Sequence, residues 1–150
     1  MNTLEIRKLI RGNSLLNTQF GAVLSADELK TIDLTEKRYF VVNTQAKPLR
    51  GRHWVCLYIN TSSNLVEYWD SIGNKPQYYG EYFHDFFKNV DYIYNERRLQ
   101  GQENTCAHFC LYFMYHRHRQ YTMQEIVNRL TPDPACNDII VVNFVENCVK

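Results

Sequence analysis

The sequence predicts a single α+β domain. Short runs rich in β-branched and aromatic residues occupy the middle of the chain, and a long apolar helical run follows them. The 150 residues are enough for one sizeable core, so we expect one domain over residues 1–150. Hydrophobic residues make up 45% of the chain and charged residues 22%, which is ordinary for a globular domain and argues against disorder.

Charge and cysteine usage narrow the possible functions. The formal net charge is +1, so the chain as a whole gives no electrostatic reason to bind nucleic acid. The five cysteines are odd in number and lack tight spacing, so they do not indicate a disulfide framework. No apolar run is typical of a signal peptide or approaches the length of a membrane span. We therefore expect a protein of a reducing compartment, neither secreted nor in a membrane.

The first half of the chain predicts short helices and then strands. In order, we expect a helix over residues 4–11, a short helix over residues 25–30, and strands over residues 39–42, 54–59 and 65–69. Leu and Ile at helical spacing indicate the first helix, and Ser25 with Glu28 has the spacing of a capping box. The almost wholly apolar run at residues 54–59 is typical of a central strand covered on both faces.

The last two of these strands form a predicted hairpin. Residues 60–64 have turn chemistry, and residues 65–69 return as the second strand. His53 stands at the start of the first strand, and Asp70 stands at the end of the second. Because antiparallel strands bring these positions to the same end of a sheet, we expect the two side chains to lie close together.

Helices dominate the second half of the chain. We expect a helix over residues 78–89, a strand over residues 90–94, an irregular connection over residues 95–105, and helices over residues 106–119, 122–130 and from residue 133 onward. Four aromatic residues of the first helix should be buried, namely Tyr79, Tyr82, Phe83 and Phe86. Thr122 with Glu125 has the spacing of a second capping box, and Asp133 is a suitable N-cap for the last helix.

The junction at Cys106 carries the clearest chemical signal. A polar loop ends there and a helix begins, so the thiol lies near the positive end of the helix dipole, which favours thiolate. A cysteine hydrolase also needs a base, a group that orients the base and an oxyanion donor. His53 and Asp70 are expected to supply the first two. Gln100 is placed to turn its amide toward the oxyanion, beside the free backbone N–H of Cys106.

Each of these residues also has an ordinary structural explanation. A lone cysteine is more often a small core residue, and an aspartate before Ser-Ile-Gly is usually a turn residue. A metal site of Cys106 and Cys110 with His116 or His53 is a further alternative. Structural zinc sites prefer a two-residue cysteine spacing from a turn, so we expect no metal and a core position for Cys110. His108 lies about 200° around the helix from Cys106 and is not expected to be the base.

The order His-Trp, carboxylate, Gln and Cys resembles the adenain-like cysteine proteases, the maturation proteases of adenoviruses and their relatives. This family lies within the wider group that includes the ubiquitin-like-modifier proteases. Residues 42–44 and 51–54 match the family's VNT…GxHW run. Asp70 with Gly73 matches the family's acidic residue followed by x-x-Gly. Residues 100–106 match the family's Q-G-x-N…C segment. The resemblance covers residues 40–115, which is about half of the chain.

This resemblance implies a papain-like fold with a central mixed β-sheet flanked by helices. It implies a thiol endopeptidase whose catalytic residues are His53, Asp70, Gln100 and Cys106. The implied substrates are capsid or core precursors of a virus or virus-like element, cut near Gly-Gly or Gly-X sites through a thioester during particle maturation. Trp54 is then expected to line the substrate cleft, with packing beside His53 as its alternative role. The expected location is the host-cell nucleus or cytoplasm and the virion.

Three features depart from the family's pattern. Ala107 replaces the usual Gly after the cysteine, residues 89–98 lack the Cys that binds an activating capsid-derived peptide, and the chain is shorter. The sequence requires no cofactor. A peptide or DNA activator and a weak nucleic-acid contact stay open, although no residue pattern supports the activator. Two alternatives stay open. One is a deubiquitinase- or deSUMOylase-type protease that removes ubiquitin-like modifiers, and the other is a non-enzymatic protein-binding module with the same fold.

Overall fold

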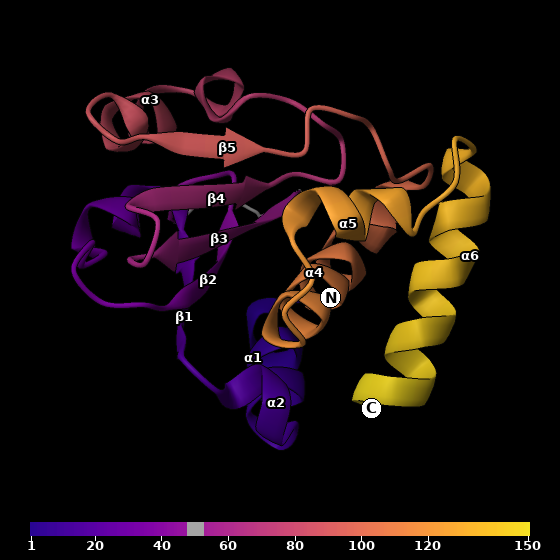
Figure 1. The fold of residues 1–150 in the computed structure, drawn as a ribbon. Coiled ribbons are helices and arrows are strands. Elements are labelled where there is room, and N and C mark those ends of the chain that lie inside the picture. Colours follow the sequence, from indigo (N-terminus) through magenta and orange to yellow (C-terminus); the bar gives the residue numbers. More distant parts are fainter. Residues whose placement is uncertain (48–52) are drawn as a thin grey trace.

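A mixed sheet of strands in the order β1-β2-β3-β4-β5 runs through the molecule (Figure 1). The computed structural model describes residues 1–47 and 53–150. The strands are β1 (Phe20–Ser25), β2 (Tyr39–Asn43), β3 (Trp54–Asn60), β4 (Leu65–Trp69) and β5 (Tyr92–Tyr94). The two outer pairs, β1 with β2 and β4 with β5, are parallel, and the two inner pairs are antiparallel. The predicted α+β class with a mixed sheet is confirmed.

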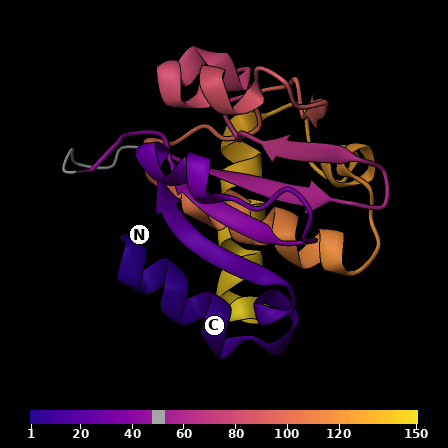
Figure 2. The same ribbon diagram turned by 90° about the vertical axis from the view of Figure 1, so that its left-hand side faces the viewer.

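Alternate residues of the strands supply two separate cores, one on each face of the sheet. Tyr39, Val41 and Cys56 face the larger core, which is completed by residues of α1 (Thr3–Gly12) and α4 (Cys106–His118). The neighbouring strand residues face the other core, beneath η1 (Ala26–Thr31) and α3 (Glu81–Phe87). Figure 2 shows α1 and α3 on opposite sides of the strands. Burial on both faces explains why β3 is apolar along almost its whole length.

The β3–β4 hairpin forms as the sequence predicts. Cys56 pairs with Trp69 near one end and Asn60 with Leu65 near the turn. The predicted loop over residues 43–51 extends beyond the described part of the chain, and Gly51 and Arg52 of the GxHW run also lie outside it. The hairpin therefore brings the start of β3 and the end of β4 to one edge of the sheet.

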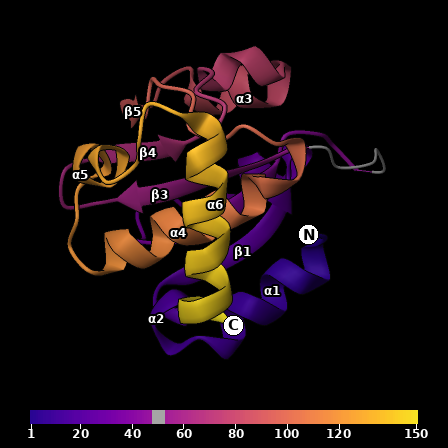
Figure 3. The ribbon, with the colours of Figure 1, turned by 90° about the vertical axis from the view of Figure 1, so that its right-hand side faces the viewer.

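Local helix signals also predict the structure well. Ser25 with Glu28 and Thr122 with Glu125 both form capping boxes, at the starts of the 3-10 helix η1 and of α5 (Met123–Asn128). The side chain of Asp133 accepts a hydrogen bond from Ala135 N–H and caps α6 (Pro134–Phe144), which continues as η4 (Val145–Val149). Figure 3 shows α6 lying across α4, so the last helix covers the helix that begins at Cys106.

The predicted helix over residues 78–89 is shorter than expected. Gly80 has a φ of +104° and separates a 3-10 turn, η2 (Pro76–Tyr79), from α3. Within α3 the buried residues are Phe83 and Phe87, and Phe86 is partly buried against the same core. The prediction that Tyr82 is buried is wrong, since its side chain is 49% exposed. Tyr79 is partly buried and has a polar role described below.

Two elements were not predicted, the short helix α2 (Ser14–Asn17) and the strand β1. Between Phe20 and Ala22 the register of β1 shifts, so Gly21 lies at an irregularity, where its backbone approaches the ring of Phe40.

No helix in the described ranges has both the length and the apolar character needed to span a membrane.

Candidate functional site

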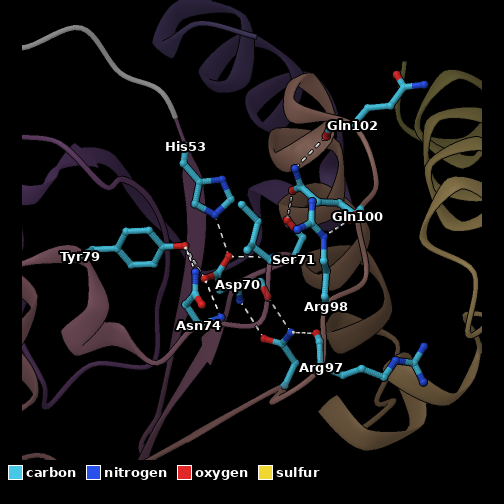
Figure 4. Close-up of polar contacts among 11 residues, drawn as sticks. His53, Asp70, Ser71, Asn74, Tyr79, Arg97, Arg98, Gln100 and Gln102 are labelled. Atoms are coloured by element: carbon cyan, nitrogen blue, oxygen red, sulfur yellow. Dashed lines mark hydrogen bonds and ion pairs between the residues drawn. The ribbon is translucent and has the colours of Figure 1, made fainter.

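The ends of the β3–β4 hairpin place His53 beside Asp70. Nε2 of His53 lies 2.7 Å from Oδ1 of Asp70, and both side chains are buried (Figure 4). This distance is short for a hydrogen bond between a ring nitrogen and an oxygen, as expected when the acceptor is a carboxylate. The sequence-based expectation that these two side chains meet is confirmed.

The carboxylate of Asp70 is fixed by further donors. Its Oδ1 also accepts the backbone N–H of Ile72 at 2.9 Å. Its Oδ2 accepts the hydroxyl of Tyr79 at 2.6 Å and the backbone N–H of Asn74 at 3.2 Å. The side chain of Asn95 bonds to both the backbone N–H and the carbonyl of Asp70, at 2.8 and 2.6 Å. These bonds satisfy a buried carboxylate and leave it one orientation toward the imidazole.

Cys106 begins α4 and faces His53. Its side chain is buried, with 5% of the residue exposed. Burial alone would raise the pKa of the thiol, but a hydrogen bond to His53 and the positive charge of its imidazole outweigh burial and lower that pKa. Hydrogen bonds with the backbone of Trp54 and Ala107 act in the same direction. The surroundings of this sulfur therefore favour thiolate.

The imidazole of His53 shows the complementary shift. Burial alone would lower its pKa, but hydrogen bonds to Asp70 and Cys106, together with their negative charge, raise the pKa to about 9. The two groups titrate as a pair, because each charge stabilises the other. The imidazolium of His53 therefore favours the thiolate of Cys106, and the thiolate in turn favours the imidazolium.

Gln100 is buried and its amide is held at both ends. Its Oε1 accepts a hydrogen bond from the hydroxyl of Ser71, and its Nε2 donates to the carbonyl of Gln102 at 2.8 Å. The carbonyl of Ser71 also accepts the backbone N–H groups of Leu99 and Gln100, at 2.7 and 3.0 Å. The amide nitrogen carries two N–H groups, and Gln102 uses one within the described residues. The other is available to an additional acceptor.

Trp54 is largely enclosed next to His53. Its indole N–H donates to the backbone carbonyl of Met1 at 3.1 Å, and its ring packs in the larger core. The same residue also lines a surface groove together with Arg7 and Lys47. The packing role of Trp54 is therefore observed, whereas the described lining of this groove contains none of His53, Gln100 and Cys106, and the role of Trp54 in a substrate cleft stays a prediction.

The alternative metal site receives no support from the geometry. Within the part of the chain that the structure describes, no three His, Cys, Asp or Glu side chains are grouped so that they could hold a metal ion. Cys110 packs in the core as predicted, where burial raises its pKa well above the ordinary value. Nδ1 of His116 lies 2.9 Å from the carbonyl of Tyr112 and so has a partner within its own helix.

Three residues that support the site were not predicted as site residues. Ser71 was treated as part of a turn, Tyr79 as a core residue and Asn95 as part of an irregular connection. The one available signal was at Tyr79, because a tyrosine on a buried face usually needs a partner for its hydroxyl. The partners of Ser71 and Asn95 lie 29 and 25 residues away in the chain, which no local pattern reports.

Comparison with known proteins shows a shared fold. No family model and no curated protein sequence matches the chain. The solved structure of the ASFV pS273R protease matches 93% of this chain with a TM-score of 0.65 and 15% identity. ChlaDub1 from Chlamydia trachomatis matches 74% of it with a TM-score of 0.50 and 14% identity. The chain spans 65% of the length of the first structure and 58% of the second. The chain therefore shares their fold over the matched residues.

Proposed function

We propose that this chain is a cysteine protease that hydrolyses peptide bonds through a thioester on Cys106. The observation that carries the proposal is the buried imidazole of His53, which lies 2.7 Å from Asp70 and close enough to Cys106 for each of the two groups to shift the pKa of the other. Such an arrangement provides a nucleophile, a proton carrier and an orienting carboxylate in one place. The fold shared with the ASFV pS273R protease supports the same activity class. We infer that residues 1–150 form a single protease domain.

The reaction begins with attack of the Cys106 thiolate on the scissile carbonyl carbon. The carbonyl π-electrons move to the oxygen, and the backbone N–H of Cys106 and the free amide N–H of Gln100 stabilise the resulting oxyanion. As the C–N bond breaks, the imidazolium of His53 gives its proton to the departing amine. A thioester remains on Cys106, and the imidazole is neutral.

Water completes the cycle. Neutral His53 removes a proton from a water molecule as the water oxygen attacks the thioester carbon. Collapse of this second tetrahedral intermediate breaks the C–S bond and releases the carboxylic acid product. The thiolate and the imidazolium are then restored. Asp70 holds the imidazole in its correct orientation and stabilises its positive charge. No step requires a metal or an organic cofactor.

We infer further that the substrates are precursor proteins of a virus or virus-like element, cut near Gly-Gly or Gly-X sites during particle maturation. The fold shared with a viral protease supports the viral role. The burial of His53, Gln100 and Cys106 supports small residues at the cleavage point, because a narrow approach admits a chain without side chains most easily. Such an enzyme would act in the host cell and the virion.

A panel of substrates tests this function. The wild-type chain and its Cys106→Ala variant are incubated with capsid-type Gly-Gly peptides and with ubiquitin and SUMO fusions, each with and without DNA, and products are identified by mass spectrometry. We expect the wild-type chain to cut the Gly-Gly peptides and the variant to cut nothing. Cleavage confined to the fusions would instead assign the chain to the proteases that remove modifiers. Binding of peptides without cleavage by either chain would indicate a non-enzymatic module.

A further inference from the structure

The last helix supplies a buried carboxylate to the loop between Gln100 and Cys106. Asp138 on α6 is 3% exposed. Its carboxylate accepts the backbone N–H of Gly101 at 3.0 Å, the backbone N–H of Gln102 at 2.8 Å and the hydroxyl of Thr105 at 2.9 Å. One side chain therefore binds three of the five residues that separate Gln100 from Cys106.

The residue before it holds the same loop from its other end. The amide Nδ2 of Asn137 donates to the carbonyl of Leu99 at 3.1 Å, and Asn137 is fully buried. Its Oδ1 accepts the backbone N–H of Thr131 at 2.7 Å, which fixes the orientation of the amide. Consecutive residues of α6 thus bind the backbone immediately before and immediately after Gln100.

The close approach of this loop to α6 requires a glycine. A Cβ atom on Gly101 would lie 2.8 Å from Oδ2 of Asp138 and 3.2 Å from the backbone of Pro134 and Ala135. Both distances are shorter than ordinary van der Waals contacts. The absence of a side chain at position 101 is what allows the carboxylate to reach the backbone N–H groups.

The chemistry of these contacts requires an acceptor with no donor. The backbone N–H groups of Gly101 and Gln102 can only donate, and the N–H of Gly101 lies 3.0 Å from both side-chain oxygens of Asp138, so both oxygens act as acceptors. An asparagine at this position would place an NH₂ group against at least one donor. The loop itself contains only the short 3-10 turn η3 (Glu103–Thr105), so the bonds from α6 are a large part of what fixes it.

We propose that Asp138 is a positioning residue for the reaction, which holds the 100–105 loop so that Gln100 and the N–H of Cys106 converge on the oxyanion. This inference rests on the proposed protease function. Oxyanion donors stabilise a transition state only when they are held close to the productive geometry. The His53–Asp70 pair comes from the β3–β4 hairpin and does not depend on α6. The groups that lower the pKa of the Cys106 thiol are His53 and the backbone of Trp54 and Ala107, so we expect Asp138 to affect oxyanion stabilisation and not the ionisation of this thiol.

The experiment compares Asp138→Asn with the wild-type chain by two measurements. The first is kcat for a cleaved Gly-Gly peptide, which we expect to fall by about 10- to 100-fold. The upper end of this range is about the effect of removing one oxyanion donor completely. The second is the pH dependence of Cys106 alkylation by iodoacetamide. Because alkylation forms no oxyanion, we expect its pH dependence to be unchanged. Asp133→Asn is the matched control, because Asp133 caps the same helix without touching the loop, and it should keep the wild-type kcat.

Two additional variants separate positioning from folding. Thr105→Val removes the hydroxyl that lies 2.9 Å from Asp138 and 3.0 Å from the carbonyl of Gln102, with little change in volume, and kcat should fall several-fold even if Asp138→Asn does not fold. If Asp138 acts through Gln100, then the Gln100→Ala Asp138→Asn double variant should lose less than the product of the two single losses. Fully multiplicative losses would contradict this route.

The outcomes distinguish this inference from the function on which it rests. Wild-type kcat in both Asp138→Asn and Thr105→Val would overturn the inference and leave the protease function intact. Loss of alkylation in parallel with kcat would also overturn it, because that result indicates a general structural role. A wild-type chain that is alkylated at Cys106 but cleaves no peptide would contradict the protease function, and with it the catalytic role of Asp138.

Discussion

Asp70 and Ser71 are consecutive residues that orient two different partners. Oδ1 of Asp70 lies 2.7 Å from Nε2 of His53, while the hydroxyl of Ser71 donates to Oε1 of Gln100. The turn that follows β4 therefore fixes both the proposed base and the proposed oxyanion donor. A displacement of this turn would affect both groups together, although they lie 47 residues apart in the chain.

Asp70→Asn tests the orienting carboxylate. The substitution keeps the size of the side chain but removes the charge that stabilises imidazolium, so kcat should fall by about 10²- to 10⁴-fold. Some activity should remain, because Asp70 does not react. Steady-state kinetics on a cleaved peptide measures the effect. Wild-type activity in Asp70→Asn would transfer the role to another residue, for which Glu67 is a poor candidate, since its carboxylate pairs with Arg117.

Tyr79→Phe tests the second support of the same carboxylate. The variant loses the 2.6 Å bond to Oδ2 of Asp70 but keeps the aromatic ring beside His53. Because one hydrogen bond to a charged group is lost, kcat should fall by roughly 10-fold. Tyr78→Phe is the control, since Tyr78 is 71% exposed and should tolerate the change. Equal kcat values for both variants would show that the hydroxyl of Tyr79 does not contribute to the reaction.

Gln100→Ala tests the proposed oxyanion donor. Loss of one such donor should lower kcat by about 10²-fold while the alkylation rate of Cys106 stays near the wild-type value. Gln102→Ala is the matched control in the same loop, because Gln102 contributes backbone groups and its side chain is exposed. An unchanged kcat in Gln100→Ala would leave oxyanion stabilisation to backbone N–H groups alone.

The pH dependence of kcat/KM should reflect the thiolate–imidazolium pair. On the acid side, activity should fall when the Cys106 thiolate gains a proton, below the ordinary thiol range because His53 lowers this pKa. On the alkaline side, activity should fall near pH 9, where His53 loses its proton. In Asp70→Asn the alkaline limb should move to lower pH, since the carboxylate raises the pKa of His53. An alkaline limb that stays in place would contradict this origin.

Gly101→Ala tests the close approach of the loop to α6. The added methyl group would lie 2.8 Å from Oδ2 of Asp138, so both the melting temperature and kcat should decrease. Gly12→Ala is the control, because a Cβ at that position has no neighbour within 4 Å. Thermal unfolding and peptide cleavage of the two variants measure the effect. Equal melting temperatures would show that the loop can move away from the helix without cost.

The parts of the structure that sequence patterns predicted are those with local causes. The hairpin follows from two strand-like runs and five turn residues, and its geometry alone brings His53 to Asp70. The capping boxes at Ser25 and Thr122 each depend on residues three positions apart. Gln100 and Cys106 share one loop, so their spacing could be interpreted without knowledge of the rest of the fold.

The parts that escaped prediction depend on distant partners or on an unusual backbone. Strand β1 contains Gly21, which weakens the strand pattern, and its parallel pairing with β2 is a tertiary contact. The break between η2 and α3 occurs at Gly80, whose positive φ sequence periodicity does not report. The bonds of Asp138 cross 33 to 37 residues, and an aspartate inside a helix resembles a surface residue until its partners are known.

The bond between Trp54 and Met1 has a practical consequence for the recombinant protein. The indole N–H of Trp54 donates to the carbonyl of Met1 at 3.1 Å, and Trp54 directly follows His53 in the chain. An affinity tag fused ahead of Met1 would therefore emerge next to Trp54, close to the proposed site. Kinetic measurements on this chain are best made after such a tag has been cleaved off.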